Sequence, residues 1–171
     1  MALPPEESEH IVSFICRGLL TIRGFTHALL EELPPEAHAR PLTPGGVHPL
    51  WIAGHLAVSD EWIHGMFEPI DSVLPSNFRS LFGHDTTAIA DPSPYPDLAT
   101  VLTLMARTRK NLLNGVQRAA PSALRRPLGD EGVGFAETPL DAVNRILWHE
   151  GWHAGQLSCL RRALGLPGIF P

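Results

Sequence analysis

Two histidines spaced four residues apart, His149 and His153, are the residues whose types and spacing most directly predict chemistry. If this segment is an α-helix, both imidazoles lie on one face and can bind a single metal ion at Zn–N distances of about 2.0–2.1 Å. Glu150 completes the pattern H-E-x-x-H, in which helical metalloproteases use two histidines as zinc ligands and the glutamate as general base. The segment therefore predicts a metal site, which could serve a peptidase or a different chemistry.

The peptidase interpretation lacks a third ligand. The sequence after His153 contains no further His, Asp or Glu. The extended peptidase motif would need glycine at position 156 and histidine at position 159, where this chain has Gln156 and Cys159. A zinc peptidase is therefore disfavoured, and the remaining ligand has to lie upstream.

A third histidine is available in the apolar segment LWIAGHLAVSDEW, where His55 follows Gly54. Glycine beside His55 would let a neighbouring helix approach closely. His64 lies nine residues further on and faces the opposite side of the helix, because an α-helix has about 3.6 residues per turn. His48 is on the side of His55, but it stands at the helix start and is expected to cap it. The predicted metal ligands are therefore His55, His149 and His153.

The surroundings of the histidine pair indicate that both imidazoles point inward. Ile146, Trp152 and Gln156 lie at the matching steps of three and four residues along the same helix. Two imidazoles turned into apolar material are costly unless their nitrogens are satisfied, and a metal ion satisfies both. Trp51, Trp62 and Trp152 could line a pocket beside the site or fill the core, and we expect at least two of them to fill the core.

Three polar residues near the pair are candidates for supporting roles. Glu150 is expected to be a helix-surface acid or to bond a ligand imidazole. Gln156 could orient a ligand or bond a substrate, and Arg145 could bind a substrate carboxylate or simply be exposed. The other four histidines are expected to be solvated or to cap helices: His10, His27, His38 and His84.

Apolar residues recur at steps of three and four along most of the chain, which predicts α-helices. One well-defined start is at Thr138, a capping residue followed by Pro139 at the first helical position and by the acidic Asp141. Gly165 and Pro167 are stop signals for the same helix. The predicted helices cover residues 6–32, 49–66, 97–120 and 139–164.

The connections between these helices determine the predicted topology. Residues 67–96 contain five prolines and Gly83, so they are expected to form a long link with little regular structure. Residues 125–139 could form a loop or a short hairpin. No convincing period-2 segment appears, which favours an all-α four-helix bundle in one domain over residues 1–171. The long link suits a crossover that leaves the second and third helices running in the same direction.

Composition excludes several classes of protein. The net charge is −5 and basic residues form no run longer than two, so nucleic acid is not an expected partner. The acidic N-terminus and the arginines in the first apolar segment exclude a signal peptide and a membrane span, and we expect a cytoplasmic protein. Cys16 and Cys159 are too few for a disulfide framework, and both are expected to be small buried hydrophobic residues.

Two motifs together resemble the DinB/YfiT-like superfamily: HPLWIAGHLA at 48–57 and HEGWHAGQLSCLRRALGLP at 149–167. The resemblance implies a small four-helix bundle that holds a divalent metal ion on His55, His149 and His153. It also implies a homodimer, and a reaction such as metal-dependent transfer of a low-molecular-weight thiol, for example bacillithiol or mycothiol, or isomerisation of maleylpyruvate.

Three neutral imidazoles would leave a metal ion with its full positive charge and an open position, as in catalytic sites. Water or a thiol is acidified at such a position. We therefore expect a metal-dependent transferase or hydrolase that activates a thiol or water and acts on a small molecule. The alternative is a non-catalytic metal-binding or stress-related dimerising protein. Zinc, nickel and iron are all expected candidates, because imidazole suits each of them.

Overall fold

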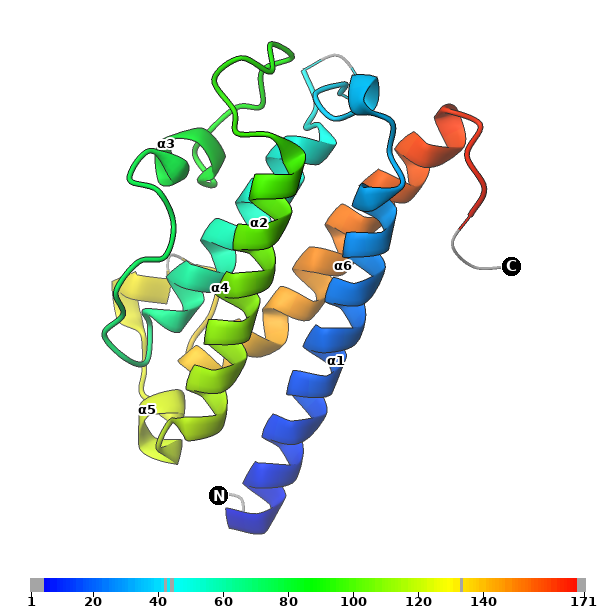
Figure 1. The fold of residues 1–171 in the computed structure, drawn as a ribbon. Coiled ribbons are helices and arrows are strands. Elements are labelled where there is room, and N and C mark those ends of the chain that lie inside the picture. Colours follow the sequence, from blue (N-terminus) through cyan, green and yellow to red (C-terminus); the bar gives the residue numbers. More distant parts are fainter. Residues whose placement is uncertain (1–4, 42, 44, 133, 169–171) are drawn as a thin grey trace.

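A computed structural model describes residues 5–41, 43, 45–132 and 134–168, and all regular structure in them is helical (Figure 1). Two short helices and two 3-10 turns accompany four long helices. The long helices are α1 (Pro5–Glu31), α2 (Pro49–His64), α4 (Leu98–Arg118) and α6 (Pro139–Ala163). The short ones are α3 (Phe78–Phe82) and α5 (Pro121–Arg125), with 3-10 turns at Pro35–Ala37 and Gly129–Gly132. The predicted all-α class is confirmed.

The four long helices form a bundle in which α1 and α6 run in one direction and α2 and α4 in the other (Figure 1). α2 packs most extensively on α4, and α1 on α6. The link over residues 67–96 crosses from the end of α2 back to its starting level, so α2 and α4 are parallel, as the length of the link predicted. The link contains α3, and the segment 125–139 contains a 3-10 turn where a hairpin was one expectation.

Side-chain caps explain where two of the helices that carry histidines begin. The Thr138 side chain accepts a hydrogen bond from the backbone N–H of Asp141, and Pro139 occupies the first turn. His48 caps α2 as expected, because its Nδ1 accepts from the backbone N–H of Trp51 at 3.0 Å. The stop after α6 is Gly165, whose φ of 74° is the left-handed conformation that favours glycine.

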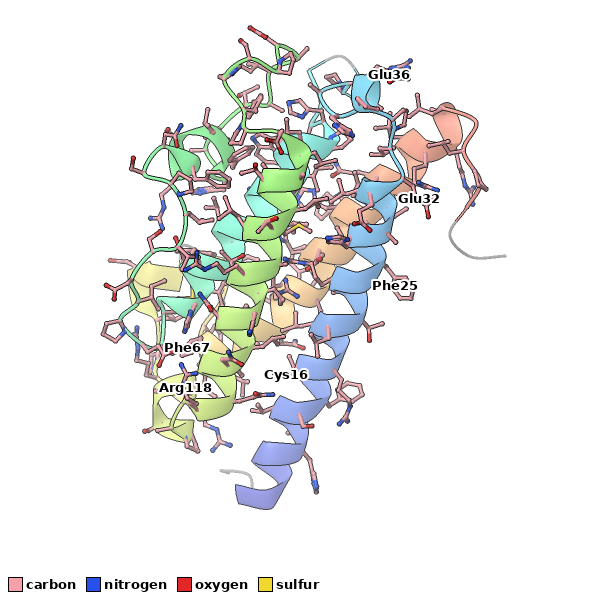
Figure 2. The ribbon with its side chains drawn as sticks, viewed as in Figure 1. Cys16, Phe25, Glu32, Glu36, Phe67 and Arg118 are labelled. Atoms are coloured by element: carbon pink, nitrogen blue, oxygen red, sulfur yellow. The ribbon has the colours of Figure 1, made fainter. Side chains whose placement is uncertain are left out.

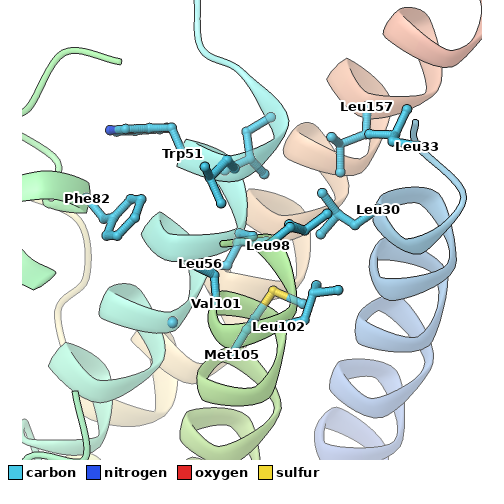
Figure 3. Packing of buried hydrophobic residues seen from close by; sticks show 14 of the residues in the cluster. Leu30, Leu33, Trp51, Leu56, Phe82, Leu98, Val101, Leu102, Met105 and Leu157 are labelled. Carbon is cyan, nitrogen blue, oxygen red and sulfur yellow. The ribbon is translucent and has the colours of Figure 1, made fainter. Parts of the chain in front are cut away.

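The core consists of two apolar clusters stacked along the bundle axis. Figure 3 shows part of the first cluster, where side chains of all four long helices meet Phe82 of the short helix α3. Almost all of α2 is buried between its neighbours, so this helix is the central element of the fold. On α1, by contrast, the large apolar side chain of Phe14 is 71% exposed.

The two cysteines differ in their environments. Cys16 is buried on α1, as predicted (Figure 2), and burial raises the pKa of its thiol. Cys159 on α6 is exposed, so the prediction of a buried residue was wrong there. None of the described helices is long and apolar enough to cross a membrane.

Candidate metal centre

Three histidines from two helices converge at one point of the bundle. His55 comes from the middle of α2, and His149 and His153 come from successive turns of α6. One nitrogen from each ring lies within 4.8 Å of the other two, and the Nε2 atoms of His55 and His149 are 3.2 Å apart. The structure therefore brings together the three residues that their spacing selected.

The separation of the nitrogens suits a shared metal ion. Bonds of 2.0–2.1 Å at tetrahedral angles place two ligand nitrogens about 3.4 Å apart, close to the 3.2 Å between His55 and His149. Two neutral imidazoles this close can share at most one hydrogen bond, whereas a metal ion would satisfy all three rings. Within the described part of the chain, no carboxylate or cysteine belongs to this cluster.

Hydrogen bonds on the far side of two rings hold them in a ligating orientation. His55 Nδ1 lies 2.9 Å from the carbonyl oxygen of Phe82, and His153 Nδ1 lies 2.8 Å from Oε1 of Gln156. Each acceptor favours the tautomer with hydrogen on Nδ1, which leaves the Nε2 lone pair free for a metal. His149 Nδ1 is buried and has no partner among the described residues.

Burial keeps all three rings in the neutral form that binds metals. It is the main cause that lowers the pKa of His55 to about 4 and of His149 to about 3. The neighbouring imidazoles add to the effect, since His153 lowers the pKa of both. Burial also lowers the pKa of His153. At neutral pH the site consequently offers three uncharged nitrogen donors.

The crossover link supplies the carbonyl that holds His55. The last residue of α3, Phe82, lies against Gly54, where a Cβ atom would be only 2.3 Å from its ring. The absence of a side chain at Gly54 therefore lets α3 approach α2 closely enough for the Phe82 carbonyl to reach His55. Trp51 stacks on the His55 ring, with ring centroids 4.5 Å apart and an angle of 10° between the planes, and its indole N–H donates to Thr86 Oγ1. Trp51 is buried, so it orients His55 and fills the core.

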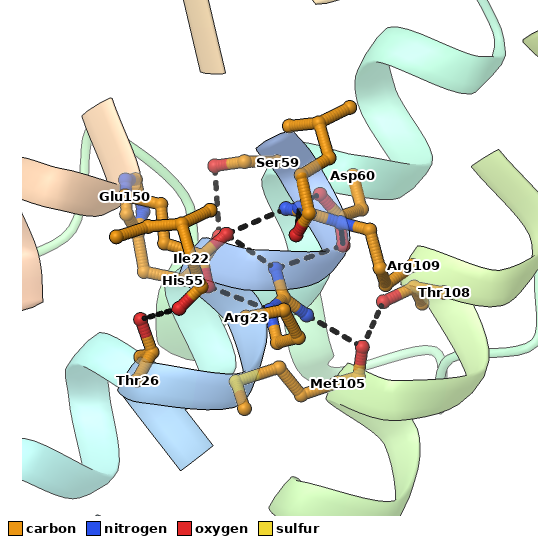
Figure 4. Close-up of polar contacts among 11 residues, drawn as sticks. Ile22, Arg23, Thr26, His55, Ser59, Asp60, Met105, Thr108, Arg109 and Glu150 are labelled. Carbon is orange, nitrogen blue, oxygen red and sulfur yellow. Dashed lines mark hydrogen bonds and ion pairs between the residues drawn. The ribbon is translucent and has the colours of Figure 1, made fainter. Parts of the chain in front are cut away.

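Glu150 lies in the core and not on the helix surface, so that expectation was wrong. It is fully buried and ion-paired with two arginines: its Oε1 lies 2.7 Å from Arg23 Nε, and its Oε2 lies 2.7 Å from Arg109 Nη2. Asp60 on α2 completes the group, 3.0 Å from Arg23 and 2.8 Å from Arg109 (Figure 4). Each of the four long helices thus contributes one charged residue to a buried, neutral network.

The network determines the charge state of Glu150. Burial by itself would raise the pKa of this carboxyl, but the charges of Arg23 and Arg109 and their hydrogen bonds outweigh it, so the pKa lies below its ordinary value. The same ion pairs raise the pKa of Arg109 against the effect of burial. A carboxylate held this way is a poor proton acceptor, which removes the general base that the H-E-x-x-H interpretation requires.

The four charged residues could have been found from sequence spacing, although they were not assigned a role. Arg23 follows the buried Leu19 by four positions, and Arg109 follows Met105 by four. Asp60 likewise follows the buried Leu56 by four positions, and Glu150 follows the buried Ile146 by four. A charged residue on the apolar face of each helix, with equal numbers of both signs, is the signal that indicates a buried network.

An open pocket of about 590 Å³ leads to the histidines. His55 and His149 line it, and aromatic side chains form much of its wall: Trp62, Phe135, Trp148 and Trp152. Trp152 is 65% exposed, so it lies at the pocket and not in the core. His55 and His149 therefore border an accessible cavity.

Of the remaining candidates, Arg145 and His64 do not line the histidine pocket, whereas His84 does. Arg145 pairs with Asp141 one turn earlier, with 2.9 Å between Nε and Oδ2, so it is not positioned for a ligand of the pocket. His64 bonds Glu68 on another side of α2. His84 pairs with the adjacent Asp85, and both side chains are largely exposed.

Comparison with known proteins identifies the family of the chain. No curated protein matches the chain. The family model described as DinB superfamily matches residues 19–157, a range that includes α2, α4 and the three histidines. Because the match covers most of the chain and the fold is the expected helical bundle, this protein belongs to the DinB superfamily.

Proposed function

We propose that this protein is a metal-dependent enzyme that activates a thiol or a water molecule at His55, His149 and His153 for reaction with a small electrophile. The observation that carries the proposal is the convergence of three neutral imidazoles, two of which, His55 and His149, line an open pocket. A structural zinc site is closed by four protein ligands, whereas a catalytic site keeps an open position. The described residues supply three donors here.

Each part of the site has a role in this proposal. The three histidines would hold a divalent ion, for which zinc, nickel and iron are the candidates. Such an ion supplies Lewis acidity, which lowers the pKa of a thiol or water. Gln156 and the Phe82 carbonyl orient two of the rings, and the aromatic wall shields the reacting groups from bulk water on one side.

Thiol transfer is favoured over peptide hydrolysis. Glu150 is occupied by Arg23 and Arg109 on the core side of α6, so the peptidase general base is missing. A thiolate is itself the nucleophile and needs no separate base once its proton is lost. The substrate thiol is proposed to be a low-molecular-weight compound, as the family resemblance implies.

Metal analysis tests the assignment of the site. We expect protein purified without added metal to contain about one divalent ion per chain. His55→Ala and His153→Ala should lose most of it, and His10→Ala, on the exposed part of α1, should keep it. Full occupancy in both site variants, with circular dichroism showing folded protein, would contradict the proposed ligands.

A cobalt-substituted sample tests thiol activation. Binding of a physiological thiol at the ion should add a sulfur-to-cobalt charge-transfer band and should alter the visible spectrum. The same thiol should leave cobalt-treated His153→Ala unchanged. If several thiols leave the wild-type spectrum unchanged, thiol activation is wrong, and activation of water becomes the remaining enzymatic candidate.

A second candidate is a non-catalytic metal-binding protein that acts as a dimer. Exposed apolar residues on α1 favour self-association, with Phe14 71% and Leu20 58% exposed. We propose a homodimer for either candidate, and light scattering coupled to gel filtration tests it. The absence of any spectral response to thiols or to exchangeable anions such as azide would favour the non-catalytic candidate.

A further inference from the structure

The pocket beside the histidines has two chemically different walls. One wall is a chain of aromatic rings in which Trp62 contacts Phe135 at 5.7 Å between centroids, Phe135 contacts Trp148 at 6.2 Å, and Trp148 contacts Trp152 at 6.2 Å. Phe135 and Trp148 also lie 6.4 Å and 6.3 Å from the His149 ring. The aromatic surface therefore extends from the histidine cluster to the pocket rim.

Much of this aromatic surface remains open to solvent. Trp148 is 51% exposed and Trp152 is 65% exposed, an unusual state for two large rings on neighbouring turns of one helix. Exposed aromatic rings around a cavity next to polar groups are typical of ligand sites. A flat, apolar molecular body would cover these rings by stacking or edge contacts.

The other wall is formed by residues of α3 and of the segment that follows it: Arg79, Gly83, His84, Asp85 and Thr86. Among the described residues that line this pocket, Arg79 is the only arginine, and there is no lysine. His84 and Asp85 on the same wall pair with each other at 2.8 Å. Across the described residues, Arg79 has no ion pair with a carboxylate. Its guanidinium is therefore available to bind a planar anion through two hydrogen bonds.

From these two walls we infer that the pocket binds a small molecule with a flat apolar body and a carboxylate, in which the body covers the Trp148–Trp152 surface and the carboxylate pairs with Arg79. A volume of about 590 Å³ accommodates a molecule of this size. This inference rests on the proposed function, because it names the class of electrophilic substrate for the same site.

Calorimetry with a matched pair of probes tests the inference. 2-Naphthoate has the flat body and the carboxylate, and 2-naphthamide has the same body without the charge. We expect the metal-loaded protein to bind naphthoate about tenfold more tightly than naphthamide, as a charge-assisted pair at a partly exposed site would give. Arg79→Gln should abolish that preference and leave naphthamide binding unchanged.

Two further variants separate the contributions of the walls. Trp152→Ala should weaken both probes by a similar factor of about ten, because it removes aromatic contact area that both share. Arg107→Gln, an exposed arginine of α4 outside the pocket, should change neither. Equal affinity of the two probes in the wild-type protein, or no binding of either, would overturn the inference.

A metal-free arm distinguishes this inference from the proposed function. If the carboxylate pairs with Arg79, the preference for naphthoate persists without metal. If the preference for naphthoate depends on metal and is insensitive to Arg79→Gln, the carboxylate binds at the histidines and the inference is wrong. Failure of the metal analysis with an intact, Arg79-dependent preference would instead overturn the proposed enzyme and leave the binding pocket standing.

Discussion

His149 and Glu150 are adjacent in the sequence, yet they serve different parts of the molecule. Consecutive residues of an α-helix point about 100° apart, so His149 faces the pocket while Glu150 faces the buried arginines. The pattern H-E-x-x-H consequently has two ligand candidates but no catalytic base. The role of each residue in this motif therefore has to be inferred separately, from what its side chain contacts.

Gln156 is the residue whose role can be tested most directly. Its Oε1 lies 2.8 Å from His153 Nδ1, so Gln156→Leu should remove the acceptor that orients this ring. We expect metal affinity to fall about tenfold, which is the lower end of the decrease expected when a ligating histidine loses its hydrogen-bond partner. Competition with a chromophoric chelator measures the change. Gln117→Leu, at an exposed position of α4, is the matched control, and equal affinities in the two variants would contradict a positioning role.

At the scale of elements, the crossover link is part of the site. α3 rests on Gly54 and presents the Phe82 carbonyl to His55. The long link thus has a structural reason beyond connecting two parallel helices. Its contact with α2 fixes the tautomer of one candidate ligand and also forms one wall of the pocket.

Substitution of Gly54 tests this contact. A Cβ atom at this position would be 2.3 Å from the Phe82 ring, so Gly54→Ala should displace α3 and destabilise the protein by about 1–3 kcal/mol. Metal affinity should fall as well, because the Phe82 carbonyl would move. Gly155→Ala is the control, since nothing lies within 4 Å of the Cβ position. It should be neutral or stabilising by up to about 1 kcal/mol. Urea unfolding measures both, and equal effects would refute the close-packing argument.

The buried network joins all four long helices through side chains. Glu150→Gln keeps the shape of the side chain but leaves Arg23 and Arg109 with Asp60 as their remaining carboxylate partner. Removing one partner of a buried ion pair costs about 3–5 kcal/mol, so the free energy of unfolding should fall by that order. Glu36→Gln, at an exposed position, should change it little. A loss below about 1 kcal/mol for Glu150→Gln would show that the network does not stabilise the bundle.

At the scale of the whole molecule, three neutral imidazoles, of which His55 is buried and His149 and His153 are half-buried, make stability depend on pH. An unfolded histidine has a pKa near 6.5, whereas burial lowers the pKa of His55 to about 4 and of His149 to about 3. As pH falls below 6.5 the unfolded chain takes up protons that the folded chain cannot. The metal-free protein is therefore most stable above pH 6.5, and stability is lost as pH falls toward the folded-state values.

Urea unfolding of the metal-free protein at pH 7, 6 and 5 measures this dependence. We expect the free energy of unfolding to decrease by about 2 kcal/mol for each of His55 and His149 between pH 7 and pH 5. His149→Phe should reduce the decrease by about 2 kcal/mol, and the exposed His10→Gln should preserve it. A pH-independent wild-type protein over this range would contradict burial of neutral imidazoles.

Much of the fold could be predicted because the signals are local. Apolar residues at steps of three and four identify the helices, and Thr138-Pro139 marks the start of α6. The length of the link predicted parallel α2 and α4. Cys159 was misplaced because it lies on an exposed face of α6, whereas its neighbours Leu157 and Leu160 are buried, so an apolar residue type was a poor guide to burial.

The sequence by itself determined the helices, the family resemblance and the face of α6 that carries His149 and His153, since helical periodicity depends on near neighbours. Only the tertiary structure decided which groups meet those residues. His55 reaches His149 across 94 positions, Glu150 meets Arg23 across 127, and Phe82 meets His55 through the crossover link. Such contacts depend on how helices pack and how the chain returns between them, and spacing within a single helix contains no information about either.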